Sequence, residues 1–285
     1  MKNNDILNRL CRSIINTLLF LPGRFTKDIL LYLLKYAGEG VIRSRYGFNI
    51  YYRPGRSHEN KRKRDIILGW YEDKELKFIK QFIRRGDYVI DCGAFEGYFS
   101  LYMSHVVGKD GRVFSIEPNK ENLHVLRDNI ICNKPGNIEV IERAVSNERT
   151  EMDFYYRSDS GSGGALVKYP HFRDVNSLRV EVDTLDNLFK DLRHDIKFIK
   201  LDLEGNEYNA LLGAQDILSR HKPYLSFELN LTFWAYHDVS VSKFFDYLKG
   251  LDYKCYIPRD GKLIPLGFLG KRISNIFAVH RSRES

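Results

Sequence analysis

The sequence predicts an α/β protein: a Rossmann-like doubly wound sheet that follows an N-terminal extension of helices and a hairpin. Short apolar strands alternate with amphipathic helices along residues 87–285. The first of these strands runs into a glycine turn and then a helix, which is the start of a nucleotide-binding βαβ unit. Because 43% of the 285 residues are hydrophobic, the chain has enough apolar residues for a full core.

The glycine turn separates a predicted strand at residues 88–91 from a helix that begins at residue 98. Phe95 stands where the dinucleotide fingerprint G-x-G-x-x-G has its second glycine. Asp91 and Glu96 place carboxylates where a pyrophosphate needs bare N–H groups. A cationic ligand suits this charge, and S-adenosylmethionine carries both a sulfonium and an ammonium group. The alternative is an ordinary glycine loop of an α/β protein.

The positive charge of the chain is concentrated near its start. Residues 1–86 hold 19 Lys and Arg against 8 Asp and Glu, whereas the remainder holds 26 against 29. The near-neutral charge of the remainder argues against a broad nucleic-acid face on the core domain. The cysteines show neither C-x-x-C pairing nor metal-ligand spacing, which predicts reduced thiols in a cytoplasmic protein.

Residues 1–40 are expected to form an amphipathic helical extension, with helices at 5–21 and 26–36 and a stop at Pro22-Gly23. Neither apolar stretch is long enough to cross a membrane, and no signal-peptide pattern is present. Two interpretations stay open. The helices form a lid packed on the domain, or they attach the protein peripherally to the anionic inner face of a membrane.

Residues 41–86 are expected to lead into the core through a β-hairpin at 41–53 and one helix at 65–85. The basic run at residues 61–64 is interpreted as a solvated face, with attraction of an acidic substrate or a phosphate as the alternative. Residues 87–285 then make up the Rossmann-like domain.

The apolar segments of residues 87–285 predict the remaining strands and helices of the core domain. Further strands are expected at 111–117, 138–141, 151–156, 178–182, 196–202, 224–228, 253–257 and 275–279. Helices are expected at 120–132, with Asn119 as the cap, and at 240–250. A short helix is expected to open at 183–186, and another helix after Asn206 is expected to carry the apolar residues between Leu211 and Leu218. The glycine- and serine-rich residues 158–164 are expected to form a mobile loop that covers a substrate.

Carboxylates recur where the predicted strands end. The five are Asp91, Glu117, Asp202, Glu204 and Glu228. Ligands bind at the carboxyl ends of the strands in such a sheet, so these acids are expected to hold a cation. Glu117 is placed to accept hydrogen bonds from ribose hydroxyls, and the small residues around Ala144 leave room for an adenine ring. The alternatives are an Mg²⁺ site that also uses Asn230, which is not favoured, and pairing with Lys200 or nearby arginines.

The motifs in their order resemble those of the FkbM-type methyltransferases over about residues 41–230. They are the segments 53–55, 70–72, 91–97, 115–118, 143–146, 182–186 and 199–207. The resemblance implies a class I, S-adenosylmethionine-dependent O-methyltransferase acting on sugars or other small molecules that bear hydroxyls. The residues expected to bind the donor are Asp91, Gly93, Ala94, Gly97, Glu117, Asn119 and Ala144. The pair Phe95-Glu96 departs from the family, which usually has a small polar and an aliphatic residue there.

Methyl transfer to a hydroxyl needs an aligned acceptor and a base for its proton. Asp202 and Glu204 are the first candidates for this base and Glu228 is the next; no residue is assigned to a metal. The expected acceptor is a small molecule or a glycan, and two interpretations of the aromatic segment 234–236 stay open: stacking on a sugar ring, or plain packing. Two rival functions remain: an RNA methyltransferase that grips phosphates with its basic N-terminal segment, and a non-catalytic scaffold.

Overall fold

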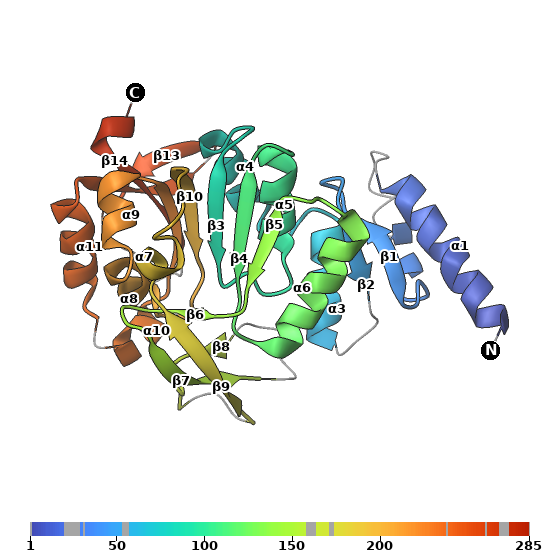
Figure 1. The fold of residues 1–285 in the computed structure, drawn as a ribbon. Helices are drawn as coiled ribbons and strands as arrows, with labels where there is room; N and C mark the ends of the chain where they lie inside the picture. Colours follow the sequence, from blue (N-terminus) through green and yellow to red (C-terminus); the bar gives the residue numbers. More distant parts are fainter. Residues whose placement is uncertain are drawn as a thin grey trace.

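The structure is a computed structural model that describes residues 2–19, 29–30, 32–52, 57–157, 164–170, 174–237, 239–259, 261–267 and 274–284. Within these residues the largest element is an eight-stranded sheet (Figure 1). Its strands, from one edge to the other, are β13 (Lys262–Pro265), β12 (Tyr253–Arg259), β14 (Ser274–His280), β11 (Tyr224–Leu229), β10 (Ile196–Leu201), β3 (Tyr88–Cys92), β4 (Arg112–Ile116) and β5 (Ile138–Ile141).

The strand order confirms a Rossmann-like doubly wound sheet. β11, β10, β3, β4 and β5 run parallel, and β14 runs antiparallel between β11 and β12. The chain proceeds outward from β3 in one direction through β4 and β5, and then in the other through β10 and β11. The order therefore reverses between β3 and β10, and in such sheets the ligand crevice lies at the carboxyl ends beside that point.

Helices cover both faces of the sheet. Apolar side chains of α4 (Asp73–Phe82) and α5 (Tyr98–Val107) pack with Val89 and Phe198 on one face. The other face packs against α7 (Leu185–Leu188), α8 (Glu207–Leu212), α9 (Gln215–Arg220) and α11 (Val241–Gly250). Since side chains alternate along a strand, Ile90 and Ile199 belong to this second layer.

The same alternation sends a row of polar residues toward α4 and α5. Asp91 accepts a hydrogen bond from Ser100 of α5, and Ser226 donates one to Glu75 of α4. Lys200 lies over the ring of Phe99 at the start of α5. A buried polar layer therefore lies on this face, next to the carboxyl ends of β3, β10 and β11.

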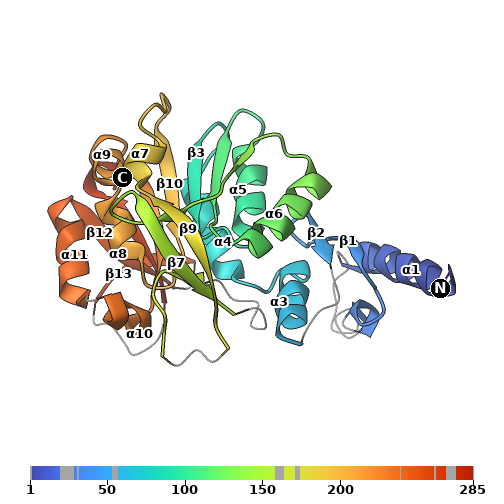
Figure 2. The same cartoon turned by 60° about the horizontal axis from the view of Figure 1, so that its bottom comes forward.

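A second, smaller sheet has the order β6 (Ala144–Val145), β9 (Asn176–Asp183), β7 (Thr150–Tyr156) and β8 (Gly164–Ala165). It projects from the ends of the main strands (Figure 2). The strands expected at 151–156 and 178–182 do form, but they pair with each other in this sheet rather than in the main one. The loop predicted at 158–164 lies outside the described residues except for Gly164.

The N-terminal part starts with α1 (Lys2–Leu18), which lies at the side of the molecule in both views (Figures 1 and 2). The predicted hairpin is confirmed as β1 (Gly40–Arg43) and β2 (Asn49–Tyr52). α6 (Lys120–Asn133) packs beside β2, and the predicted cap forms because Asn119 accepts a hydrogen bond from the Glu121 amide. Residues 29–30 and 32–34 are helical, as expected for 26–36, whereas Pro22-Gly23 lies outside the described residues.

Two predicted helices are wrong in extent. The single helix expected at 65–85 is two helices, α3 (Ser57–Ile67) and α4, because Gly69 and Glu72 both adopt positive φ in between. The helix expected through Leu218 is divided into α8 and α9 at Gly213, where a Cβ would lie 2.2 Å from the Ser146 carbonyl oxygen. The short α10 (Leu231–Trp234) and the strand β13 were not predicted.

Candidate active site

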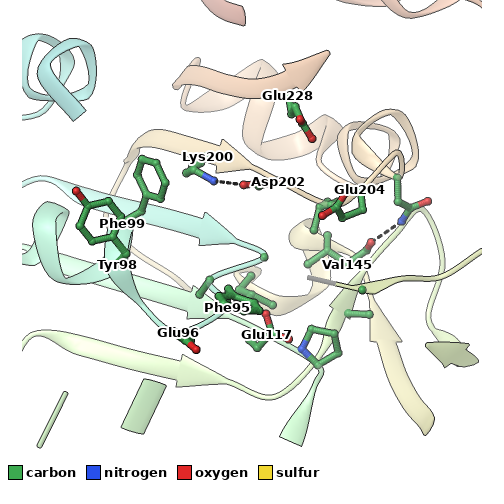
Figure 3. A pocket seen from close by; sticks show the side chains of 18 of the residues that line it. Phe95, Glu96, Tyr98, Phe99, Glu117, Val145, Lys200, Asp202, Glu204 and Glu228 are labelled. Atoms are coloured by element: carbon green, nitrogen blue, oxygen red, sulfur yellow. Dashed lines mark hydrogen bonds and ion pairs between the residues drawn. The ribbon is translucent and has the colours of Figure 1, made fainter. Parts of the chain in front are cut away.

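A cavity of about 420 Å³ lies at the carboxyl ends of β3, β4, β10 and β11. The small sheet contributes Phe154 and Gly164 to its wall, and the connection between α3 and α4 contributes Tyr71 and Glu72. In Figure 3, Phe95 and Glu117 lie on one side of the cavity, across from Asp202, Glu204 and Glu228. The glycine turn and the acidic strand ends therefore border the same space.

Backbone hydrogen bonds hold the glycine turn in a fixed shape. The amides of Gly93 and Ala94 both donate to the Ile116 carbonyl oxygen, at 2.9 and 3.0 Å, and the Gly97 amide donates to Ala94 at 2.8 Å. Gly93 has a φ of +78°, and a Cβ there would lie 2.0 Å from the backbone oxygen of Asp202. Glycine at this position therefore lets the turn after β3 approach the end of β10 directly.

Glu117 joins this turn to the end of β4. Its Oε2 accepts a hydrogen bond from the Phe95 amide at 2.9 Å. Its Oε1 accepts from the Asn119 amide at 2.9 Å and from Asn122 Nδ2 at 3.1 Å. Burial raises the pKa of Glu117 to about 7, against the lowering effect of these donors. A carboxylate has about four acceptor sites, so Glu117 can accept a further hydrogen bond from a ligand hydroxyl.

The seven residues predicted to bind a donor do not all reach the cavity. The four that line it are Gly93, Ala94, Glu117 and Ala144. Asp91 is fully buried below it, where Oδ2 accepts from Ser100 Oγ at 2.6 Å and Oδ1 has no hydrogen-bond partner among the described residues. Gly97 and Asn119 lie at the starts of α5 and α6, outside the cavity lining. The Gly97 amide closes the turn that carries Gly93 and Ala94, and the Asn119 amide donates a hydrogen bond to Glu117.

The three carboxylates predicted as bases come together in the cavity wall. Burial, reinforced by the neighbouring carboxylate of Asp202, raises the pKa of Glu228 to about 8. The same two causes hold the pKa of Glu204 well above its ordinary range. The Asp202 side chain is more open, and its Oδ2 lies 2.8 Å from Lys200 Nζ. The pairing with Lys200 considered from the sequence is thus present for Asp202.

Lys200 is a buried cation among several acids. Burial disfavours its charge, but Asp202, Glu75, Asp91 and Glu72 outweigh this effect and raise its pKa well above the ordinary value. Its Nζ also lies 4.3 Å from the centre of the Phe99 ring. Lys200 therefore offsets part of the negative charge that the strand ends collect.

The basic run at residues 61–64 is not the solvated face that the sequence suggested. The side chains of Arg62 and Lys63 are 16% and 4% exposed, and both approach Glu96 Oε1, at 3.3 and 3.7 Å. The Arg62 guanidinium also lies 4.1 Å from the centre of the Phe95 ring. The unusual pair Phe95-Glu96 thus has its partners in α3, and Glu96 is not an uncompensated charge for a cationic ligand.

Sequence reasoning missed several residues that build the site. Tyr71 and Glu72 line the cavity, and the signal for them was their place in the family-like segment 70–72. Glu207 is buried and accepts hydrogen bonds from the Leu203 amide at 2.9 Å and from Trp234 Nε1 at 3.0 Å. Trp234 is therefore buried packing, the second of the two roles expected for segment 234–236, and does not offer a free stacking surface.

Phe233, one residue before segment 234–236, lines the cavity and stacks on Tyr169 with ring centres 4.6 Å apart.

Across the described ranges, no three His, Cys, Asp or Glu side chains gather as ligands for a metal ion. In the same ranges, every helix falls short of the length and hydropathy needed to span a bilayer.

Residues 91–255, more than half of the chain, match the methyltransferase FkbM domain. The chain belongs to the FkbM methyltransferase family. The resemblance read from the motifs is thereby confirmed, and the strand order of the main sheet is the Rossmann-like doubly wound order expected from the sequence. No curated protein matches the sequence.

Solved structures similar to this FkbM-family chain have low sequence identity. An FkbM methyltransferase from Methylobacillus flagellatus KT is 19% identical with a TM-score of 0.42, over 79% of this chain and 55% of that chain. This chain thus spans about half the length of the Methylobacillus protein. An O-methyltransferase from Thermotoga maritima is 16% identical with a TM-score of 0.42, over 90% and 83%. Aeropyrum pernix fibrillarin, with bound S-adenosyl-L-methionine, is 12% identical with a TM-score of 0.43, over 85% and 83%.

Proposed function

We propose that this FkbM-family chain is an O-methyltransferase that uses S-adenosylmethionine to methylate a hydroxyl of a sugar, a glycan or another small molecule. The observation that carries the proposal is the composition of the cavity wall, with Glu117 on one side and Asp202, Glu204 and Glu228 on the other. Such a wall accepts hydrogen bonds and favours neutral or cationic ligands. It disfavours a phosphate-bearing acceptor, because like charges would meet in a partly buried space.

The residues present fit this donor. A cavity of about 420 Å³ has the size of a small-molecule site, and Glu117 offers carboxylate oxygens to ribose hydroxyls. Ala94 and Ala144 are small, so a flat ring can lie against the backbone beside them. S-adenosylmethionine supplies a methyl group that its sulfonium has already activated. The positive charge of the donor would lower the raised pKa values of Glu204 and Glu228 and so favour their charged forms.

Glu228 is the carboxylate best suited to take the proton of the acceptor hydroxyl. A general base works best when its pKa lies near the working pH, and Glu228 has a pKa of about 8. Asp202 is less suited because its Oδ2 is already paired with Lys200 at 2.8 Å. Glu228 would receive the proton of the acceptor hydroxyl, and a donor held beside Glu117, Ala94 and Ala144 would supply the activated methyl group to the acceptor oxygen.

The proposed function is tested by calorimetry with S-adenosylmethionine and by a transfer assay with labelled donor. The acceptor panel holds neutral sugars and glycans, hydroxyl-bearing lipids, phosphorylated sugars and RNA. We expect heat of donor binding and label on a neutral hydroxyl acceptor. An absence of binding heat would favour the non-catalytic scaffold, and label on RNA alone would favour the RNA methyltransferase.

The role of Glu228 is tested by Glu228→Gln. We expect kcat to fall by about 10²–10⁴-fold, because the base is removed, while the Kd for the donor changes little. The wild-type rate should rise with pH up to about 8, since Glu228 must lose its proton before it can accept one. The control is Glu139→Gln, whose carboxylate is exposed on β5 and paired with Arg112. If kcat is unchanged in Glu228→Gln, then Glu228 is not the base.

A further inference from the structure

The helix α1 has two apolar faces, and the rest of the described chain covers only one of them. Cys11, Ile15 and Leu19, which follows its last turn, are buried. Ile15 and Leu19 pack in one cluster with the hairpin residues Ile42 and Tyr52. The apolar side chains on the other side are between 37% and 67% exposed; they are Ile6, Leu7, Leu10 and Ile14. Because these four recur at intervals of three, four and seven residues, they form a continuous stripe along the helix.

The exposed stripe continues onto the segment that follows. Ile29, Tyr32 and Tyr36 are exposed, and the rings of Tyr32 and Tyr36 touch with centres 5.1 Å apart. Their neighbours Leu30 and Leu34 are buried in the same apolar cluster as Ile15 of α1. Apolar side chains that the fold does not need are thus gathered on one projecting part of the molecule. Figure 1 shows α1 at the edge, away from the main sheet.

The part of the sequence that carries this stripe has a net positive charge. Residues 1–52 hold eight Lys and Arg against three Asp and Glu, whereas the chain after residue 86 carries slightly more acids than bases. Two copies of such a segment would repel each other, which disfavours a second copy as the partner. A phosphate-bearing surface attracts it, and among such surfaces only a lipid layer also accepts isoleucine and leucine side chains.

We propose that α1, together with residues 29–30 and 32–36, docks on an anionic phospholipid surface, with Ile6, Leu7 and Leu10 inserted at the boundary between headgroups and acyl chains. The apolar stripe supplies the insertion and the basic side chains supply the attraction. The docked helix lies in the plane of the surface, because the exposed stripe runs along its length while its other side packs on the hairpin. The proposal stands independently of the methyl acceptor.

The test is sedimentation of the full chain with vesicles of phosphatidylglycerol and phosphatidylcholine, compared with vesicles of phosphatidylcholine alone. We expect sedimentation with the anionic vesicles that weakens as the salt concentration rises. The triple variant Ile6→Ser, Leu7→Ser, Leu10→Ser should bind at least about tenfold more weakly. Circular dichroism checks that it folds, as expected for substitutions of exposed side chains.

The matched control is Ile131→Ser, which removes an equally exposed isoleucine (66%) from α6 and should leave vesicle binding unchanged. Binding that the triple variant retains would overturn the proposal, as would a wild-type chain that ignores anionic vesicles. A dimer that forms in solution and is abolished by the triple variant would also overturn it, because a second copy would then cover the stripe. If the wild-type chain and the triple variant both bound RNA as well as they bind anionic vesicles, charge alone would explain the attraction. That result would also overturn the proposal.

Discussion

The variant Gly93→Ala is expected to lose both donor binding and about 2–5 kcal/mol of the free energy of unfolding. A Cβ at this position would lie 2.0 Å from the backbone oxygen of Asp202, and the φ of +78° is unfavourable for alanine. The backbone oxygen cannot rotate away as the end of a flexible side chain would. Relief requires the turn after β3 and the end of β10 to separate, and these two segments carry Ala94 on one side and Asp202 on the other.

Urea unfolding and calorimetry with S-adenosylmethionine measure the two effects of Gly93→Ala. The matched control is Gly136→Ala, because Gly136 has a φ of +71° but no atom of the described residues within 4 Å of the position that a Cβ would take. This control carries only the cost of the left-handed backbone, about 1–2 kcal/mol. The difference between the variants therefore isolates the clash. If the two variants lost equal amounts of unfolding free energy and of donor affinity, the close approach of β3 and β10 would contribute nothing to either.

The strands and caps of the core domain could be predicted because their signals are local. Apolar runs of four to six residues placed β3, β5, β10 and β11 within a residue or two of their observed bounds. The polar cap Asn119 marked the start of α6 for the same reason, since its side chain bonds an amide only two residues away.

The elements that were missed depend on contacts between distant segments. Gly213 ends α8 because the Ser146 carbonyl oxygen lies against it, and nothing near residue 213 in the sequence indicates that contact. Likewise, β7 and β9 pair with each other in the small sheet. An apolar pattern of period two predicts a strand but does not indicate which sheet the strand joins. The burial of Arg62 required knowing that α3 packs over Glu96.

The candidate site was predicted better in its position than in its electrostatics. The carboxyl ends of parallel strands meet at one edge, so Glu117, Asp202 and Glu228 could be expected to lie near one another. Their protonation could not be expected, because it depends on burial and on Lys200. Sequence reasoning treated Glu96 as a free charge, whereas it is paired, and it gave Asp91 a ligand contact, whereas that carboxylate lies below the cavity lining.

The variant Lys200→Met is expected to lower the free energy of unfolding by about 3–5 kcal/mol at neutral pH, because it removes a buried cation that several surrounding carboxylates share. Asp202 loses the ammonium 2.8 Å away, and Asp91, Glu72 and Glu75 lose a cation that lowers their pKa values in the wild-type chain. Methionine has a similar length, so the apolar packing against Phe99 is largely kept. The loss is therefore electrostatic rather than a cavity effect.

The dependence of this loss on pH distinguishes it from ordinary packing damage. The pKa of Glu75 is raised to about 8 when folded, above its unfolded value near 4.5, so the stability it contributes is present at low pH and is lost as the pH rises toward 8. Without Lys200 the folded pKa values of these acids rise further, and the destabilisation should be larger at pH 8 than at pH 5.5. Urea unfolding at both pH values measures this difference in destabilisation.

The control is Lys197→Met, because Lys197 lies on the same strand but is more exposed and sits over the Tyr224 ring. This variant should lower the free energy of unfolding by less than about 1 kcal/mol at either pH. A loss in Lys200→Met that is the same at both pH values would show that the acids around it do not depend on its charge.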